Sequence, residues 1–202
     1  MLDINNVSIL VGNNTLHYNR QLNAGEITTL QGISGVGKTS LLLCIAGFIP
    51  VQSGQLKWQS VQLNSLPSEK RPVAMLFQEN NLFEHISVLK NTSLGQVKAC
   101  EDEIMQAAEH LAIAEQMHKM PSELSGGQRQ RVALLRTLLR PEPIVLLDEP
   151  FAELDYHTRE ICASWVADCV KRTRKTLLLV THQNEDVERL ADHDWQLRQR
   201  EC

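Results

Sequence analysis

The eight residues from Gly32 to Thr39, GISGVGKT, constrain the fold of this chain more than any other segment. They follow a short apolar run, Ile27–Leu30, and precede a helical apolar stretch that begins at Leu41. A glycine-rich loop between a strand and a helix is typical of phosphate binding, because its glycines let backbone N–H groups converge on phosphate oxygens. The segment therefore predicts an α/β domain that binds a nucleotide.

The residues of this loop have separate expected roles. Lys38 supplies a positive charge for the outer phosphates, and the hydroxyl of Thr39 is a candidate ligand of Mg²⁺. A glycine-rich turn without a ligand is the alternative, which the flanking strand and helix disfavour. The residues expected to contact the nucleotide are Gly32, Ser34, Gly35, Gly37, Lys38, Thr39 and Ser40.

A second apolar run, Ile144–Leu147, ends in two adjacent carboxylates, Asp148 and Glu149. The carboxyl ends of strands in an open α/β sheet border the ligand crevice. Asp148 is a candidate for Mg²⁺ coordination, directly or through water, and Glu149 for deprotonating a water that attacks the γ-phosphate. An acidic pair alone also suits a solvated loop. Together with the glycine-rich loop, it predicts nucleotide hydrolysis.

The segment LSGGQRQR, from Leu124 to Arg131, combines an N-cap serine with two glycines at a helix start. Such a start exposes N–H donors to an anion. The segment resembles the signature sequence of ABC ATPases. The resemblance implies a head-to-tail dimer with two composite sites, in which the partner's γ-phosphate is contacted by Ser125, Gly126, Gly127 and Gln128.

Three further positions match motifs of that family. Gln78, in MLFQE, matches the Q-loop glutamine, which in relatives contacts Mg²⁺ or water. His182 follows the apolar run Leu177–Val180 and matches the switch histidine, while Asp155 in PFAELD matches the D-loop aspartate of the dimer interface. The resemblance implies a catalytic set of Glu149, His182 and Gln78, and a metal set of Thr39, Gln78 and Asp148.

The order of the segments predicts an α/β fold, with a P-loop NTPase (RecA-like) core, an N-terminal antiparallel β subdomain and a helical subdomain that carries the signature. We expect residues 1–202 to form a single ABC ATPase domain. Its nucleotide-binding core would comprise residues 1–78 and 132–202, and its helical subdomain residues 79–131. Helical periodicity predicts one amphipathic helix over Glu101–Met120.

The stretch from Arg71 to His85 is similar to the corresponding part of ATP-binding subunits of bacterial thiamine importers. The resemblance implies ATP as the nucleotide and a separate transmembrane permease that takes up a small solute, with thiamine as the candidate. Importers of ferric iron, sulfate or polyamines share much of this stretch. Leu82 and Phe83 are either contacts of the permease groove or core residues. Two functions outside transport compete with this interpretation, namely a soluble ABC ATPase of DNA repair or chromosome organisation and a non-catalytic nucleotide-binding module.

The resemblance also implies where the chain acts and with what. It implies a second ATPase subunit, most simply a copy of the chain, and an indirect link to a periplasmic solute-binding protein. The resemblance implies a peripheral location, on the cytoplasmic face of the inner membrane. The longest apolar run, Leu41–Val51, is shorter than the roughly 20 residues of a membrane span, so we do not expect the chain itself to cross the membrane. A net charge of −4 gives no general attraction for nucleic acid, which we do not expect as a partner. The basic run Lys171–Lys175 is expected to be a solvated helix end.

Three features depart from the family pattern. The aromatic residue that stacks on adenine in relatives would fall near Ile9–Val11, where none is present, and Tyr18 is expected in the core instead. Ala152 and Glu153 stand where relatives usually have Ser-Ala in the D-loop. The end of the chain, residues 192–202, lacks the glycine-containing hairpin that usually follows the switch histidine.

Overall fold

The N-terminal strands form an antiparallel sheet in the computed structural model, which describes residues 1–79, 82–96 and 101–197. A shift of register between Ile4 and Val7 keeps both side chains buried on the inner face of the sheet. The sheet confirms the antiparallel strands that the alternating apolar residues predict. Its strand order is β2 (Asn14–Leu22), β1 (Leu2–Val11), β4 (Ser53–Trp58) and β5 (Val61–Gln62).

A second sheet, whose described strands pair in parallel, forms the centre of the fold. All five residues of each of the strands Ile144–Asp148 and Thr176–Val180 are buried, which is typical of central parallel strands. The sheet order is β6 (Val73–Leu76), β7 (Ile144–Asp148), β8 (Thr176–Val180), β3 (Ile27–Gln31) and β9 (His193–Gln196).

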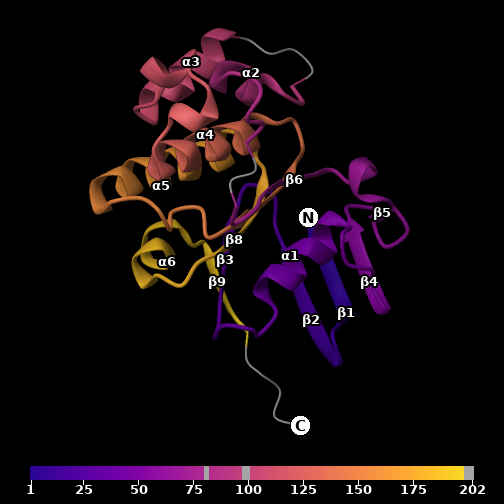
Figure 1. Cartoon of the computed structure of the whole chain (residues 1–202). Coiled ribbons are helices and arrows are strands. Elements are labelled where there is room, and N and C mark those ends of the chain that lie inside the picture. Colours follow the sequence, from indigo (N-terminus) through magenta and orange to yellow (C-terminus); the bar gives the residue numbers. More distant parts are fainter. Residues whose placement is uncertain (80–81, 97–100, 198–202) are drawn as a thin grey trace.

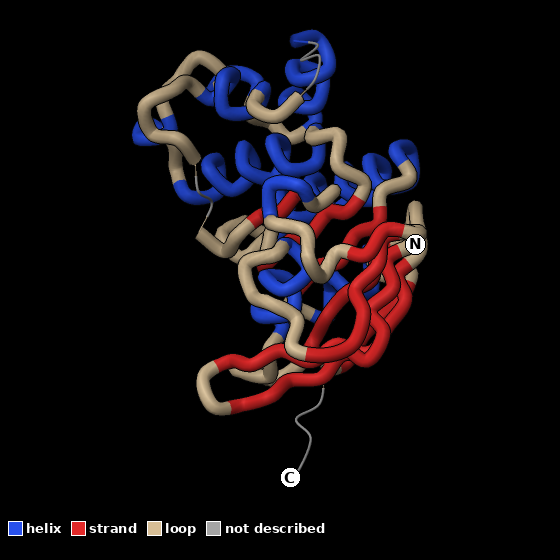
Figure 2. Tube along the Cα trace, turned by 90° about the vertical axis from the view of Figure 1, so that its right-hand side faces the viewer, coloured by secondary structure: helices blue, strands red, loops and turns tan. Residues whose placement is uncertain are grey.

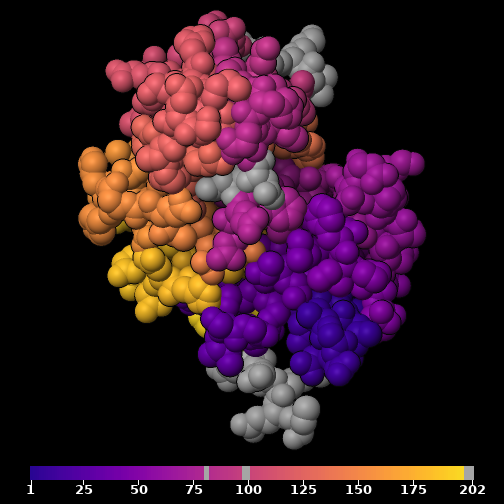
Figure 3. Space-filling model, viewed as in Figure 1, coloured from indigo at the N-terminus to yellow at the C-terminus, as the bar shows by residue number. Residues whose placement is uncertain are grey.

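Helices cover this sheet, and those between residues 88 and 139 gather at one end of the molecule. Figure 1 and Figure 2 show the antiparallel strands at the opposite end, and in the space-filling view the helices between residues 88 and 139 form a lobe of their own, the helical lobe (Figure 3). Short 3₁₀ turns occur at Ser68–Lys70, Ala114–Gln116 and Pro121–Glu123. The α-helices are α1 (Lys38–Ala46), α2 (Val88–Ser93), α3 (Glu101–His110), α4 (Gly126–Leu139), α5 (Tyr156–Thr173) and α6 (Asn184–Leu190).

The core lies on both faces of the parallel sheet, because successive side chains of a strand point to opposite faces. On one face, Val145 and Leu147 of β7 join a buried cluster with residues of α3, α4 and α5. On the other face, Ile144 and Leu146 join a second cluster with residues of α1 and of the antiparallel sheet. The parallel sheet is thus the layer that holds the helical part and the β part together.

The amphipathic helix predicted over residues 101–120 is wrong in its length, because α3 ends at His110. The backbone turns left-handed at Ala112 (φ 51°), and the Ile113 N–H donates to the Ala108 carbonyl, a bond typical of a helix end. The apolar periodicity continues past this end, since Leu111 and Met117 are also buried. Burial in the helical lobe, rather than helix formation, accounts for the pattern beyond His110.

Three other expectations concern the basic run, the end of the chain and the absence of a membrane-spanning helix. The basic run is solvated only up to Arg174; Lys175 is buried, and its Nζ atom donates to the carbonyl oxygen of Glu142 at 2.8 Å. Strand β9 pairs with β3 in the C-terminal region that lacks a glycine hairpin, and residues 198–202 lie outside the described residues. Among the described helices, none is long and apolar enough to cross a membrane.

Candidate active site

The candidate site lies where three neighbouring strands of the parallel sheet reach their carboxyl ends. In the register of the sheet, Asp148 of β7 is opposite Val180 of β8, and Val180 is opposite Leu30 of β3. The residues that follow these three positions therefore emerge side by side. This edge of the sheet brings together the glycine-rich loop, the acidic pair and His182, and it is the edge at which open α/β sheets bind ligands.

The glycine-rich loop runs from β3 into α1 with a backbone that requires glycine at its end. Gly37 has φ 104°, and a Cβ atom there would lie 2.5 Å from the hydroxyl of Tyr18. That hydroxyl donates to the Gly37 carbonyl at 2.9 Å. Tyr18 is buried, which raises its pKa, and it confirms its predicted place in the core. Its support of the loop was not foreseen, because it depends on packing between distant segments.

Lys38 begins α1 with its side chain folded back over the loop. Its Nζ atom donates to the carbonyl oxygens of Gly32 and Ile33, at 2.7 and 3.1 Å. Burial lowers the pKa of Lys38, and the nearby carboxylates of Glu149 and Asp148 partly oppose this shift. The ammonium group is therefore held between the loop and the acidic pair, where the outer phosphates of a nucleotide are expected.

Asp148 and Thr39 meet at the mouth of the site. Burial raises the pKa of the Asp148 carboxyl, and a hydrogen bond from Thr39 opposes that rise. A hydroxyl and a carboxylate are hard oxygen ligands, and Mg²⁺ in nucleotide sites usually takes one or two carboxylates besides phosphate oxygens and water. This pair fits such an ion. Gln78, the third predicted ligand, is exposed in the bend that follows β6, the strand next to β7.

Glu149 and His182 form the other half of the site. The Oε1 atom of Glu149 lies 3.0 Å from the Nε2 atom of His182, and both side chains are partly exposed. Thr181 fixes the turn before the histidine, since its Oγ1 donates to the buried carboxylate of Asp186 at 2.6 Å and accepts from the N–H of Gln183. The carboxylate and the imidazole are thus accessible to water and held by two adjacent strands.

The signature segment begins α4 with the N-cap that the sequence predicts. The Ser125 Oγ accepts from the Gln128 N–H at 3.3 Å, and the Gln128 Oε1 accepts from the Ser125 N–H at 2.9 Å. The turn after β7 approaches the two glycines: an added Cβ at Gly127 would lie 3.2 Å from the carbonyl oxygen of Glu153, and one at Gly126 would displace the Glu153 carboxylate. The unusual D-loop residue Glu153 therefore packs against the start of the signature helix.

Asp155 has a local role that the family resemblance does not indicate. It is the N-cap of α5, and its carboxylate accepts from the backbone N–H and the hydroxyl of Thr158, at 3.0 and 2.6 Å. These hydrogen bonds, above all that of the hydroxyl, lower its pKa. Its role at a dimer interface stays a prediction.

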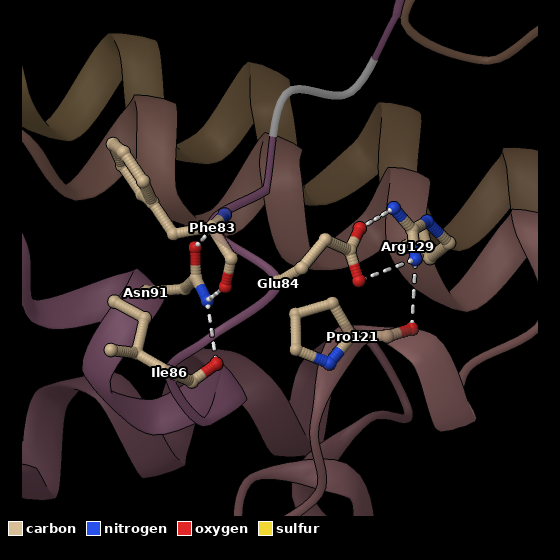
Figure 4. Close-up of polar contacts among 6 residues, drawn as sticks. All are labelled: Phe83, Glu84, Ile86, Asn91, Pro121 and Arg129. Carbon is tan, nitrogen blue, oxygen red and sulfur yellow. Dashed lines mark hydrogen bonds and ion pairs between the residues drawn. The ribbon is translucent and has the colours of Figure 1, made fainter.

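The segment from Phe83 to Ile86 is held by side chains of the helical lobe, as Figure 4 shows. The side chain of Asn91, which is fully buried, accepts from the Phe83 N–H and donates to the carbonyls of Phe83 and Ile86. The Glu84 carboxylate pairs with the guanidinium group of Arg129, which also donates to the carbonyl of Pro121 at 2.9 Å.

The sequence left open whether Leu82 and Phe83 contact the permease or lie in the core, and the structure places the two residues differently. Leu82 belongs to the buried cluster of the helical lobe, whereas Phe83 is 49% exposed. Arg136 of α4 stands 5.9 Å from the centre of the Phe83 ring. Phe83 therefore remains available as a surface contact, and Leu82 does not. Residues 80 and 81 of the stretch that resembles thiamine importers lie outside the described residues.

Comparisons with known proteins agree with this arrangement. The family described as ABC transporter matches residues 16–152. The chain is 42% identical over 197 residues to the thiamine import ATP-binding protein ThiQ of Shigella sonnei (strain Ss046), and 41% identical over 197 residues to that of Escherichia coli (strain K12). Each of these matches covers 95% of this chain and 85% of the relative.

Solved structures share the fold. The dimeric structure of MJ0796, a bacterial ABC transporter cassette, superposes with a TM-score of 0.80 at 26% identity, over 98% of this chain and 100% of that one. An ATP-binding subunit of an ABC transporter superposes with a TM-score of 0.86 at 20% identity, over 98% of this chain and 85% of that one. The second likeness is one of fold alone.

Proposed function

Because the chain belongs to the ABC transporter family and is its ATP-binding, ATP-hydrolysing subunit, we propose that it energises thiamine uptake through a separate membrane permease. The observation that carries the choice of solute is the 42% identity, over 95% of the chain, to a thiamine import ATP-binding protein. The stretch from Arg71 to His85 supports the same choice. Ferric iron, sulfate and polyamines are the competing solutes.

The side chains at the sheet edge divide the work of binding ATP. Lys38 and the backbone N–H groups of its loop bind the outer phosphates, because the loop is followed directly by the N-terminus of α1. Thr39 and Asp148, with Gln78 from the bend that follows β6, would hold Mg²⁺. When bound, the ion supplies positive charge that offsets the charge building up on the transferred phosphate.

Glu149 is the proposed general base. Its carboxylate accepts a proton from the water that attacks the γ-phosphate, and that water reaches it because the side chain is partly exposed. His182 lies within hydrogen-bond distance of the same carboxylate and orients it. When ATP is bound, His182 is also proposed to donate a hydrogen bond to the γ-phosphate.

A second copy of the chain completes each site in this proposal. Ser125, Gly126, Gly127 and Gln128 present the N-terminus of α4 to the γ-phosphate bound by the partner, and Asp155 lies near the interface between the copies. The dimeric bacterial ABC cassette, 26% identical to this chain, supports this arrangement. ATP then acts as a ligand between two subunits, and its hydrolysis allows them to separate.

The permease is proposed to contact the segment between Glu79 and Gly95, with Phe83 as one exposed contact. This attachment places the chain peripherally, on the cytoplasmic face of the inner membrane. The division into a core of residues 1–78 and 132–202 and a helical part of residues 79–131 belongs to the same proposal, since the helical part carries both the permease contact and the signature. The link to a periplasmic solute-binding protein runs through the permease.

The complex of this chain with its permease, captured from membranes and reconstituted in liposomes, tests the proposal. We expect solute-binding protein loaded with thiamine to raise ATP turnover several-fold, while sulfate, ferric iron and a polyamine leave it unchanged. Thiamine uptake should disappear when the subunit carries Glu149→Gln. Stimulation by one of the other solutes, or by none of the four, would overturn the assignment of thiamine.

A further inference from the structure

The side chain of Gln130 connects the signature helix to the turn that carries Glu149. Its Nε2 atom donates to the Glu149 carbonyl at 3.1 Å, and its Oε1 atom accepts from the Glu153 N–H at 2.9 Å. The side chain is only 4% exposed. Both ends of the amide thus meet backbone groups of the turn after β7, and exchanging the two amide atoms would place donor against donor and acceptor against acceptor.

The backbone of Glu149 adopts a conformation that the turn must maintain. Its φ is 49°, in the left-handed region that residues with a side chain rarely occupy. Its N–H donates to the Val180 carbonyl of β8 at 3.0 Å, and its carbonyl accepts from Gln130 and, at 3.3 Å, from the Ala152 N–H. The sheet therefore holds one side of this residue, and the signature helix holds the other.

The direction of the Glu149 carboxylate depends on this backbone conformation, because φ sets where the Cα–Cβ bond points. The carboxylate lies 3.0 Å from the Nε2 atom of His182. A turn that relaxes towards an ordinary conformation would move the carboxylate away from this position. Small displacements of a positioned base are costly to catalysis.

We propose that Gln130 is a positioning residue, which makes the orientation of the general base Glu149 depend on the placement of the signature helix in the same subunit. Gln128 and Gln130 are two positions apart and so face different sides of α4. Gln128 lies in the signature, and Gln130 bonds to the turn that carries Glu149. A shift of α4 would therefore move both the signature and the hydrogen bonds that hold this turn. The inference rests on the proposed catalytic role of Glu149.

The alternative is that Gln130 contributes only to stability, as a buried amide whose hydrogen bonds are satisfied. The two roles differ in what a substitution changes. A purely structural role lowers the free energy of unfolding and leaves the folded fraction fully active. A positioning role lowers kcat in folded protein and leaves the binding of ATP intact.

Two variants test the inference in the complex with the permease. Gln130→Glu keeps the size and the acceptor for the Glu153 N–H, but its carboxylate faces the Glu149 carbonyl. Gln130→Met keeps much of the volume and neither hydrogen bond. We expect each to lower kcat about 10-fold or more, while the KM for ATP changes by less than about threefold. If Gln130→Met fails to fold, Gln130→Glu decides.

Thr137 offers a matched control on the same helix. It is 2% exposed, and its Oγ1 donates to the Ala133 carbonyl at 2.8 Å, a bond that stays within α4. Thr137→Val removes this buried hydrogen bond, which should lower the melting temperature, and it should leave kcat within about twofold of the wild type. If both Gln130 variants keep the wild-type kcat while Glu149→Gln abolishes turnover, the inference is overturned and the proposed function stands. If Glu149→Gln itself retains full turnover, the inference falls together with the proposed role of Glu149 as general base, while the transport function keeps its own test.

Discussion

The Nε2 atom of His182 lies 3.0 Å from the Oε1 atom of Glu149, and the two residues follow neighbouring strands of the parallel sheet. The contact links the ends of β7 and β8 at the edge where the phosphate loop also begins. An imidazole at this distance restricts the directions in which the carboxylate can point. In the proposed function, this pair faces the γ-phosphate of the bound nucleotide.

Replacing His182 with alanine should lower ATP turnover at least about 10-fold, because the carboxylate loses its orienting partner and the γ-phosphate a donor. Steady-state phosphate release measures this effect. His193 provides a control, since its Nε2 atom lies 2.9 Å from the Glu26 carboxylate in a similar pair at the start of β9. His193→Ala should keep turnover within about twofold. Equal losses in both variants would argue against a special role of His182.

Replacing Lys38 with alanine should weaken ATP binding about 30-fold or more, the loss expected when a charged group gives up its hydrogen bonds to phosphate, ~2 to 3 kcal/mol. Titration calorimetry on the purified chain measures the affinity. Lys175 is also buried with carbonyl partners, but it lies away from the site, where its Nζ atom donates to the carbonyls of Arg140 and Glu142. Lys175→Met should reduce stability and leave the affinity unchanged; a normal affinity in Lys38→Ala would refute the phosphate contact.

Replacing Asp148 with asparagine should stabilise the chain without nucleotide at neutral pH, by ~1 kcal/mol. Burial raises the pKa of this carboxyl, so the folded state binds its proton more tightly than the unfolded state. The ionised carboxylate therefore costs stability above its folded pKa, and this cost disappears as the pH falls below the pKa of the unfolded chain. Urea unfolding of both proteins at pH 7.5 and at pH 4 should show the gain shrinking in acid. A loss of stability at pH 7.5 would contradict this account.

Replacing Asn91 with leucine should destabilise the chain by about 2 to 4 kcal/mol, because several backbone groups between Phe83 and Ser87 lose a buried partner. Denaturant unfolding measures the change. Ser93 on the same short helix is partly exposed, and its Oγ donates to the carbonyl of Lys90. Ser93→Ala should stay within about 0.5 kcal/mol. A neutral Asn91→Leu would show that the segment does not depend on this side chain.

The sequence predicts those parts of the site that are encoded locally. The strand before Gly32, the buried run that ends at Asp148 and the cap at Ser125 each lie within a few neighbouring residues. Their conformation follows from glycine, apolar residues and N-cap preferences. Their juxtaposition follows from a general rule, since the carboxyl ends of neighbouring parallel strands meet at one edge.

The contacts missed by sequence analysis join residues far apart in the chain. Tyr18 reaches the loop at Gly37, Asn91 binds backbone atoms of the preceding loop, and Gln130 bonds to Glu149. A buried glutamine in a helix of basic and apolar residues gives no local signal of its partner. The predicted length of α3 was wrong for a different reason. Buried residues continue at helical spacing after the backbone leaves the helix at Ala112.

Light scattering and phosphate release, measured together on Glu149→Gln with MgATP, test most directly whether two copies of this chain enclose ATP and whether Glu149 drives its hydrolysis. We expect turnover at least about 100-fold below that of the wild type and a particle of twice the mass of the chain, with ATP intact inside it. Wild-type turnover in this variant, or a mass of one chain at every ATP concentration, would contradict the account.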